Sequence, residues 1–258
     1  MLRRRIIPCL LLRGSGLVKT RRFKDPRYIG DAINAVRIFN DKEADELIVV
    51  DIEATPEDRP PNFELVRDLA SECFMPLAYG GGVRSVDHMD RLFSSGVEKV
   101  AVNTACLEDL SLISAGARKF GGQSVVGCID VRRRAFGGQR VVGRSGGRKT
   151  GLAPVEHARR LEGAGAGELI LQSVDLDGTK AGYDVPLVRE VVDAVRVPVI
   201  ALGGAGSLDH LAEVIVNGGA AAASAGSLFV FHGRHDGVLI NMPSEQALDA
   251  AWDRVSGT

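Results

Sequence analysis

Short runs of apolar residues alternate with longer amphipathic segments along the chain. Eight runs begin near Ile6, Leu47, Pro76, Val100, Val125, Leu169, Pro198 and Ala220. Each is rich in Val, Ile, Leu and Ala and is bounded by Gly, Pro or Asp, which predicts a parallel strand buried on both faces. The segments between the runs predict helices, because several start after Asp, Ser or Pro and end in Gly.

The spacing of the runs repeats in the two halves of the chain. Run starts are 41, 29 and 24 residues apart in the first half and 44, 29 and 22 apart in the second. Two matched sets of four strand–helix units predict an α/β fold, a (β/α)₈ TIM barrel. We expect a single domain, 1–258, built from homologous half-barrels at about 1–122 and 123–258. A doubly wound sheet is the alternative, and it fits the half-repeat less well.

The same repeat extends to polar residues near the ends of the runs. Three equivalent pairs are separated by 122 to 124 positions: Asp51 and Asp175, Gly82 and Gly204, Thr104 and Ser227. Backbone N–H groups of a glycine loop that leads into a helix bind anions. A tight turn explains one such loop equally well, but two loops at matching offsets predict two phosphate sites and a substrate with two anionic ends.

The carboxyl ends of the strands line the active face of such a barrel. Residues at or just after these ends form the predicted substrate- and phosphate-binding set: Asp51, Gly81, Gly82, Asn103, Thr104, Asp175, Asp177, Gly178, Gly203, Gly204, Gly226 and Ser227. Asp130 ends the fifth run, and Lys19 follows the first, where it would contact a phosphate or a carboxylate. Carboxylates on the rim of an apolar barrel are costly without a role, and the alternative role is capping the next loop.

Four charged residues come immediately before apolar runs: Arg5, Glu46, Lys99 and Glu168. In a barrel these positions surround the N-terminal mouth, where two cations and two anions can form a closed ring. The alternative is ordinary strand-end charges in solvent. Two longer basic, glycine-containing segments, at 13–30 and 132–151, follow the first and fifth runs and are predicted lids over the active face.

Composition excludes several classes of function. A net charge of −1 gives no electrostatic footprint for nucleic acid. No apolar stretch reaches the ~18 residues of a membrane span and no signal peptide is present, so we expect a cytoplasmic protein. The four cysteines lack CxxC spacing, and the H-x-x-H at His232 and His235 is more typical of a surface loop than of a metal site. We expect no metal and no cofactor.

Ordered motifs over nearly the whole chain resemble HisF, the cyclase subunit family of imidazole glycerol phosphate synthase. These motifs are RIIPCL, GLVKT, DELIVVDI, YGGGV, KVAVNTA, VVGCID, GAGELILQSVDLDGTKAGYD and VIALGGAG. The resemblance implies a barrel that receives ammonia from a HisH-like glutaminase docked on its N-terminal face. It also implies that Arg5, Glu46, Lys99 and Glu168 form the ammonia gate. A bis-phosphorylated small molecule would bind at the other face.

One position departs from the family pattern. The family uses two catalytic aspartates, at the ends of strands one and five, and Asp130 matches the second. The first falls at Leu11, which cannot transfer a proton. General acid–base catalysis contributes roughly 10²–10⁴-fold, so we expect cyclase activity to be badly impaired. Asp130 and Lys19 remain the catalytic candidates.

The segments RIIPCLLL, GLVKT and FKDPRYIGDAINAVRIFNDKEADEL, with YGGG for VGGG, resemble HisF-like paralogues of bacterial surface-polysaccharide synthesis. There the barrel, a HisH-like glutaminase and a third, ATP-dependent protein are implicated in amidotransfer. The resemblance implies conversion of an acetamido to an acetamidino group on a nucleotide-linked sugar of lipopolysaccharide O-antigen. Two alternatives stay open: the histidine-pathway cyclase subunit, and a non-catalytic scaffold that activates the glutaminase.

Overall fold

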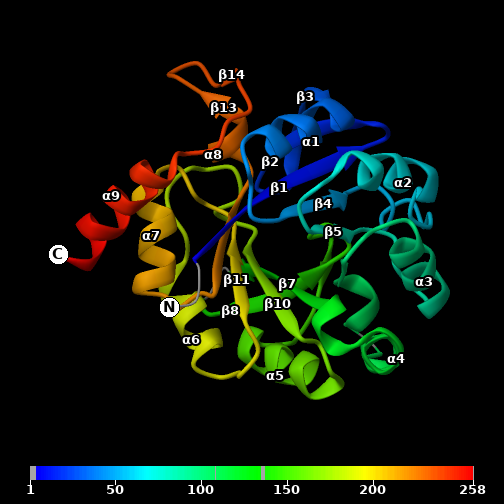
Figure 1. Cartoon of the computed structure of the whole chain (residues 1–258). Helices are drawn as coiled ribbons and strands as arrows, with labels where there is room; N and C mark the ends of the chain where they lie inside the picture. The colour runs from blue at the N-terminus through cyan, green and yellow to red at the C-terminus, as the bar shows by residue number, and fades with distance from the viewer. Residues whose placement is uncertain (1–3, 108, 135–136, 258) are drawn as a thin grey trace.

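A computed structural model describes residues 4–107, 109–134 and 137–257 of the chain. Eight parallel strands form a closed barrel (Figure 1): β1 (Arg5–Arg13), β4 (Leu47–Asp51), β5 (Leu77–Gly80), β6 (Lys99–Val102), β7 (Val125–Arg133), β10 (Glu168–Ser173), β11 (Val199–Leu202) and β12 (Ala222–Ala225). The last strand pairs with the first, with Arg5 opposite Ala222. The predicted (β/α)₈ barrel is therefore confirmed.

Helices surround the barrel: α1 (Ala32–Asp41), α2 (Phe63–Glu72), α3 (Val86–Ser94), α4 (Ser111–Phe120), α5 (Pro154–Ala164), α6 (Val185–Val192), α7 (Leu208–Val216) and α9 (Glu245–Ser256). Shorter turns are η1 (Thr104–Cys106), η2 (Gly122–Ser124) and α8 (Ser227–Val230). Six helices begin at an Asp, Asn or Ser whose side chain accepts from the amide three residues later. Across the described residues, no helix has both the length and the apolarity of a bilayer span.

Helices α3 and α7 start in the same way, 122 residues apart. Ser85 caps α3 and Ser207 caps α7. In both, a histidine in the first turn accepts through Nδ1 from a backbone N–H four residues earlier, at 3.4 Å for His88 and 3.1 Å for His210. The offset of this detailed arrangement equals the offset between Gly82 and Gly204.

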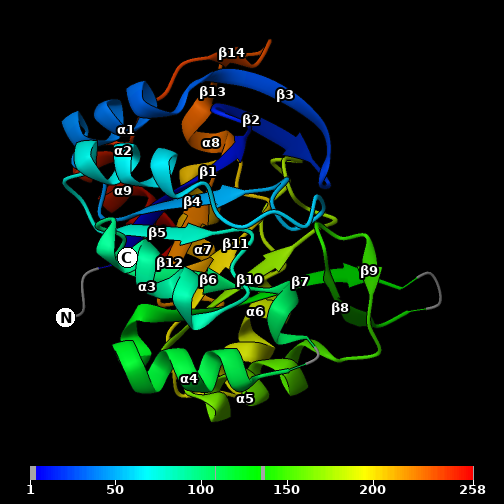
Figure 2. The ribbon, with the colours of Figure 1, turned by 90° about the vertical axis from the view of Figure 1, so that its right-hand side faces the viewer.

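The two predicted lid segments are β-hairpins. After β1, strands β2 (Gly16–Arg21) and β3 (Lys24–Asp31) fold back antiparallel, and after β7, strands β8 (Gln139–Gly143) and β9 (Arg148–Lys149) do the same. Figure 2 shows both on the side toward which the barrel strands point. Because β1 and β7 run beyond the barrel wall, their backbone groups need new partners, and the hairpins supply them. A further small hairpin joins β13 (Phe231–His232) and β14 (Gly237–Val238).

The apolar residues divide into two packed regions. One fills the space between the strands and the surrounding helices. The other fills the barrel lumen with small and branched side chains: Ile7, Cys9, Ile48, Ala78, Ala101, Val126, Ile170, Ile200, Leu202 and Ala222. The strands are thus buried on both faces, as their continuous apolar runs predict.

His157 gives the outer core a sensitivity to acid. It lies fully buried in α5, and neither ring nitrogen has a hydrogen-bond partner in the described parts of the chain. Burial, reinforced by Arg160, lowers the pKa of His157 to about 4. The unfolded chain therefore takes up this proton first, and the native state loses stability as pH falls from about 6.5 toward 4.

The wild type should lose stability between pH 7.5 and 5, and about 2 kcal/mol of that loss should come from His157. We expect His157→Leu to lack this part of the loss. Urea denaturation at the two pH values measures this difference. His232→Gln is the matched control, since His232 is exposed. An equal loss of stability in His157→Leu and the wild type would contradict the assignment.

Candidate functional site

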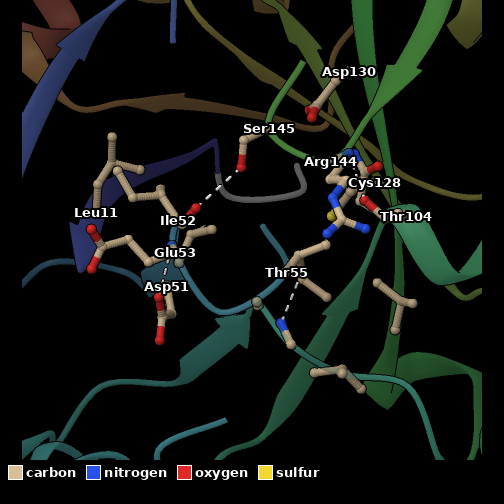
Figure 3. A pocket seen from close by; sticks show the side chains of 18 of the residues that line it. Leu11, Asp51, Ile52, Glu53, Thr55, Thr104, Cys128, Asp130, Arg144 and Ser145 are labelled. Atoms are coloured by element: carbon tan, nitrogen blue, oxygen red, sulfur yellow. Dashed lines mark hydrogen bonds between the residues drawn. The ribbon is translucent and has the colours of Figure 1, made fainter. Parts of the chain in front are cut away.

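A cavity of about 550 Å³ opens at the carboxyl ends of the barrel strands and extends into the lumen. Its floor is apolar and includes Cys9, Ile48, Ala101, Ile170 and Leu202. Predicted site residues on its wall are Asp51, Gly81, Gly82, Asn103, Thr104 and Asp130. Figure 3 looks into this cavity, with Asp130 on one side of the view and Leu11 and Asp51 on the other.

Asp130 has the most perturbed carboxyl group in the cavity. Desolvation inside the barrel raises the pKa of Asp130 to about 7, and the negative charge of Asp177 adds to the shift. The Asn103 side chain and Arg132 act in the opposite direction. A carboxyl group that titrates near neutral pH can both accept and donate a proton there.

Lys19, on β2, and Asp177, in the loop after β10, are two further largely buried charged groups, and the charge of Asp177 acts on Asp130. Asp177 Oδ2 accepts from Thr20 Oγ1 at 2.9 Å and from the backbone N–H of Phe23 at 3.3 Å. Lys19 Nζ donates to the carbonyl oxygen of Cys9. Burial raises the pKa of Asp177 and lowers the pKa of Lys19. The hairpin thus supplies a desolvated amine and covers a desolvated carboxyl group, and neither of them is among the described residues that line the cavity.

Asp51 caps the loop that follows it, as the capping alternative predicts, whereas Asp175 bonds to the distant strand β7 instead of the loop after it. Asp51 Oδ1 accepts from the backbone N–H groups of Glu53 and Ala54 at 2.9 and 3.0 Å. Asp175 Oδ2 accepts from the backbone N–H of Arg133 at 2.7 Å. Asp51 still lines the cavity, whereas Asp175 is not among its described lining residues.

Close chain packing accounts for glycines in both repeated loops. Gly81 has φ +110° and Gly204 has φ +115°, which L side chains rarely adopt. A Cβ at Gly81 would overlap the carbonyl oxygen of Asp51, and a Cβ at Gly204 would overlap that of Gly182. Gly178 likewise lies against the backbone of β2 at Thr20. Glycine is therefore required at these positions for the turns themselves.

The two predicted phosphate loops differ in their access to the cavity. The first loop, with Gly81, Gly82, Asn103 and Thr104, lines it. The second loop contains Gly203, Gly204, Gly226 and Ser227, and none of these four described residues lines the cavity. Lys19 Nζ lies directly against Gly226, where any Cβ would meet it. Of the two equivalent loops, the first therefore lines this cavity, and Lys19 lies between the cavity and part of the second.

The β8–β9 hairpin closes over the cavity mouth. Arg144 donates from its backbone N–H to Thr104 Oγ1 at 2.8 Å and from Nη2 to Asp58 Oδ2 at 2.9 Å. Ser145 Oγ donates to the carbonyl oxygen of Ile52 at 3.1 Å (Figure 3). Arg144 and Ser145 lie in a segment that the sequence predicts as a lid, but their contacts could not be predicted, because only the fold brings β8–β9 to the β4–α2 loop.

At the opposite end of the barrel, four charged side chains form a closed ring. Arg5 donates to Glu46 Oε2 at 3.0 Å and to Glu168 Oε1 at 2.6 Å. Lys99 Nζ donates to Glu46 at 2.9 Å and to Glu168 Oε2 at 2.8 Å. The two glutamates are only 3% and 5% exposed. The structure therefore shows a ring rather than separate strand-end charges in solvent.

Metal binding has no support in the described part of the chain. There, no three His, Cys, Asp or Glu side chains are grouped so that they could hold an ion. His232 and His235 lie on the β13–β14 hairpin and its turn, at the surface.

Together, the fold and the site define a (β/α)₈ barrel with a ligand cavity at one end and a charged ring at the other. The sequence profile of the family described as histidine biosynthesis protein matches residues 5–236. A relative from Pseudomonas aeruginosa, provisionally named imidazole glycerol phosphate synthase subunit hisF2, is 53% identical over 96% of this chain and 99% of its own. The subunit HisF of Alkaliphilus metalliredigens is 43% identical, over 90% of this chain and 92% of its own.

A relative from Leptospira interrogans, provisionally named as the same HisF subunit, is 45% identical over 98% of this chain and its own full length. The chain therefore belongs to the histidine biosynthesis protein family, as a HisF-like synthase subunit.

Proposed function

We propose that this chain carries ammonia from a HisH-like glutaminase to an amidotransfer on a nucleotide-linked sugar. The reaction converts an acetamido to an acetamidino group in lipopolysaccharide O-antigen synthesis. The observation that carries the proposal is Leu11, which lines the cavity where the resemblance leads us to expect a catalytic aspartate. The barrel has thus lost a proton-transfer group of the cyclase while it keeps the charged ring at the other end.

The route for ammonia runs along the barrel axis in this proposal. The glutaminase docks over the ring of Arg5, Glu46, Lys99 and Glu168, which admits ammonia. The apolar lumen beyond it favours NH₃ over NH₄⁺, because desolvation penalises the charged form. The ammonia then enters the cavity beside Asp130.

The proposed chemistry needs one proton acceptor at that point. A third, ATP-dependent protein first activates the acetamido oxygen by transferring a group from ATP to it. Ammonia then attacks the acetamido carbon, the C–O bond breaks, and the oxygen leaves with that group. Asp130 accepts the proton that the attacking nitrogen releases, and its pKa of about 7 suits that role. Gly81, Gly82, Asn103 and Thr104 bind a phosphate of the substrate, and Lys19 holds the hairpin and the second loop in place.

The second candidate is the cyclase subunit of histidine biosynthesis. The names of the relatives and the presence of Asp130 favour it. Leu11 counts against it, because a leucine stands where the cyclase has its first catalytic aspartate, and its strand neighbours are Val18 and Val50. The carboxylates on the same side of the cavity already have partners: Asp51 accepts from the loop after it, and Glu53 pairs with Arg13. A scaffold without chemistry is disfavoured by the large cavity and its desolvated acid.

Complementation of a histidine auxotroph that lacks its cyclase subunit tests the proposal. We expect the wild-type chain, although folded and expressed, not to restore growth, because Leu11 supplies no proton-transfer group. Leu11→Asp tests whether that one carboxylate restores cyclization, and Leu11→Asn is its matched control without an acid. Growth with the wild type would refute the proposal and establish the cyclase reading.

A further inference from the structure

Two arginines share one carboxylate at the open end of the cavity. Arg84 Nη2 lies 3.2 Å from Asp58 Oδ1, and Arg144 Nη2 lies 2.9 Å from Asp58 Oδ2. The three residues come from the loop before α3, from the tip between β8 and β9, and from the β4–α2 loop. All three line the cavity, and their side chains are 41%, 45% and 63% exposed. The group has two positive charges and one negative charge.

Neutral hydrogen-bonding groups adjoin this pair of arginines. Thr104 Oγ1 accepts from the backbone N–H of Arg144, and Thr55 Oγ1 accepts from the backbone N–H of Gly82 at 3.2 Å. Figure 3 shows the Arg144 guanidinium between Thr55 and Thr104. Guanidinium groups bind phosphate oxygens in a bidentate manner, and hydroxyl groups add donors at the same point.

Other cationic side chains also lie at or beside the cavity, among them Arg148 on the same β8–β9 hairpin as Arg144. Lys19, at the second repeated loop, points to the backbone of Cys9 and is covered. Arg13, which also lines the cavity, is paired one to one with Glu53 at 2.8 Å. At the Arg84–Arg144 end, by contrast, two guanidinium groups share a single carboxylate, which leaves an excess of positive charge in that group.

We propose that Arg84 and Arg144 form a clamp for a diphosphate, and that the diphosphate displaces Asp58. This inference rests on the proposed function and specifies its substrate as a diphosphate-linked rather than a two-ended bis-phosphate compound. A diphosphate concentrates its charge on adjacent groups, which two convergent guanidiniums can hold together. Before the diphosphate binds, Asp58 pairs with both arginines and holds the β8–β9 hairpin against the β4–α2 loop.

Titration calorimetry on the full chain with inorganic pyrophosphate, at fixed ionic strength, tests the clamp. We expect Arg84→Gln and Arg144→Gln each to weaken binding about fivefold, as for loss of one partly exposed charge pair. Asp58→Asn should tighten binding about threefold, because it removes the competing carboxylate. Arg37→Gln, which breaks an exposed pair with Glu72 on the helical shell, is the matched control and should leave binding unchanged.

Two results with pyrophosphate would overturn the clamp. One is pyrophosphate affinity that does not respond to loss of either arginine. The other is weaker binding in Asp58→Asn, which would make Asp58 a structural latch that the clamp requires. Fructose 1,6-bisphosphate, whose phosphates are far apart, should bind less tightly than pyrophosphate, and the reverse order would also contradict the inference. These binding results are independent of the auxotroph test, so failure of the clamp and failure of the proposed function are distinguishable.

Discussion

Lys99→Ala is expected to uncouple glutamine hydrolysis from product formation in the complex with the glutaminase. Lys99 Nζ bridges Glu46 and Glu168, both nearly buried, so its loss leaves Arg5 as the cation of the ring. Removing one partner of a buried ion pair costs roughly 3–5 kcal/mol, and the 19% exposure of Lys99 reduces this cost. We expect the barrel to fold but its mouth to admit water and release ammonia.

The measurement is the ratio of glutamate released to acetamidino product formed. We expect a ratio near one in the wild-type complex and a several-fold excess of glutamate with Lys99→Ala. Lys119→Ala is the matched control, because Lys119 forms an ion pair with Asp90 at 2.7 Å on the helical surface. An unchanged ratio in Lys99→Ala would rule out the gate role of the ring.

Asp130→Asn is expected to have the largest effect on product formation. Loss of the proton acceptor should reduce the rate by roughly 10²–10⁴-fold while glutamine hydrolysis continues. A base must be ionised to act, so the wild-type rate should rise with pH through about 7, the pKa of Asp130. The residual rate of the variant should lack that rise.

The same substitution should stabilise the barrel at alkaline pH. The pKa of Asp130 is raised in the native state, so the native state holds its proton more tightly than the unfolded chain. Its contribution to stability is therefore lost as pH rises from about 4 to 7. We expect Asp130→Asn to be more stable than the wild type at pH 8, by up to about 4 kcal/mol. Asp193→Asn, in an exposed pair with Arg189, is the control for both measurements.

A rate and pH profile unchanged in Asp130→Asn would remove Asp130 from the proposed chemistry. A normal rate with increased stability at pH 8 would confirm the desolvation of the carboxyl group but contradict its catalytic role. The stability at pH 8 reports the electrostatic environment of Asp130, and the rate with its pH profile reports its catalytic role.

Local sequence signals were sufficient for the barrel and for both of its ends. Eight apolar runs with repeated spacing specify eight strands, because a strand buried on both faces must be continuously apolar. The ring was also foreseen, since a charge just before a strand can only lie at the N-terminal rim. Asp130 was placed on the active face for the corresponding reason at the other end of its strand.

Tertiary structure decided the contacts that join segments far apart in the chain. The bond of Asp175 to Arg133, the cover of Lys19 on Gly226 and the clamp around Asp58 all depend on which loops meet above the barrel. The β2–β3 and β8–β9 hairpins formed because β1 and β7 run past the barrel wall and expose backbone groups that need partners. The sequence by itself determined the repeat, the strands and the residues at their ends. Long-range packing, which no local pattern encodes, determined which of two equivalent loops opens to the cavity.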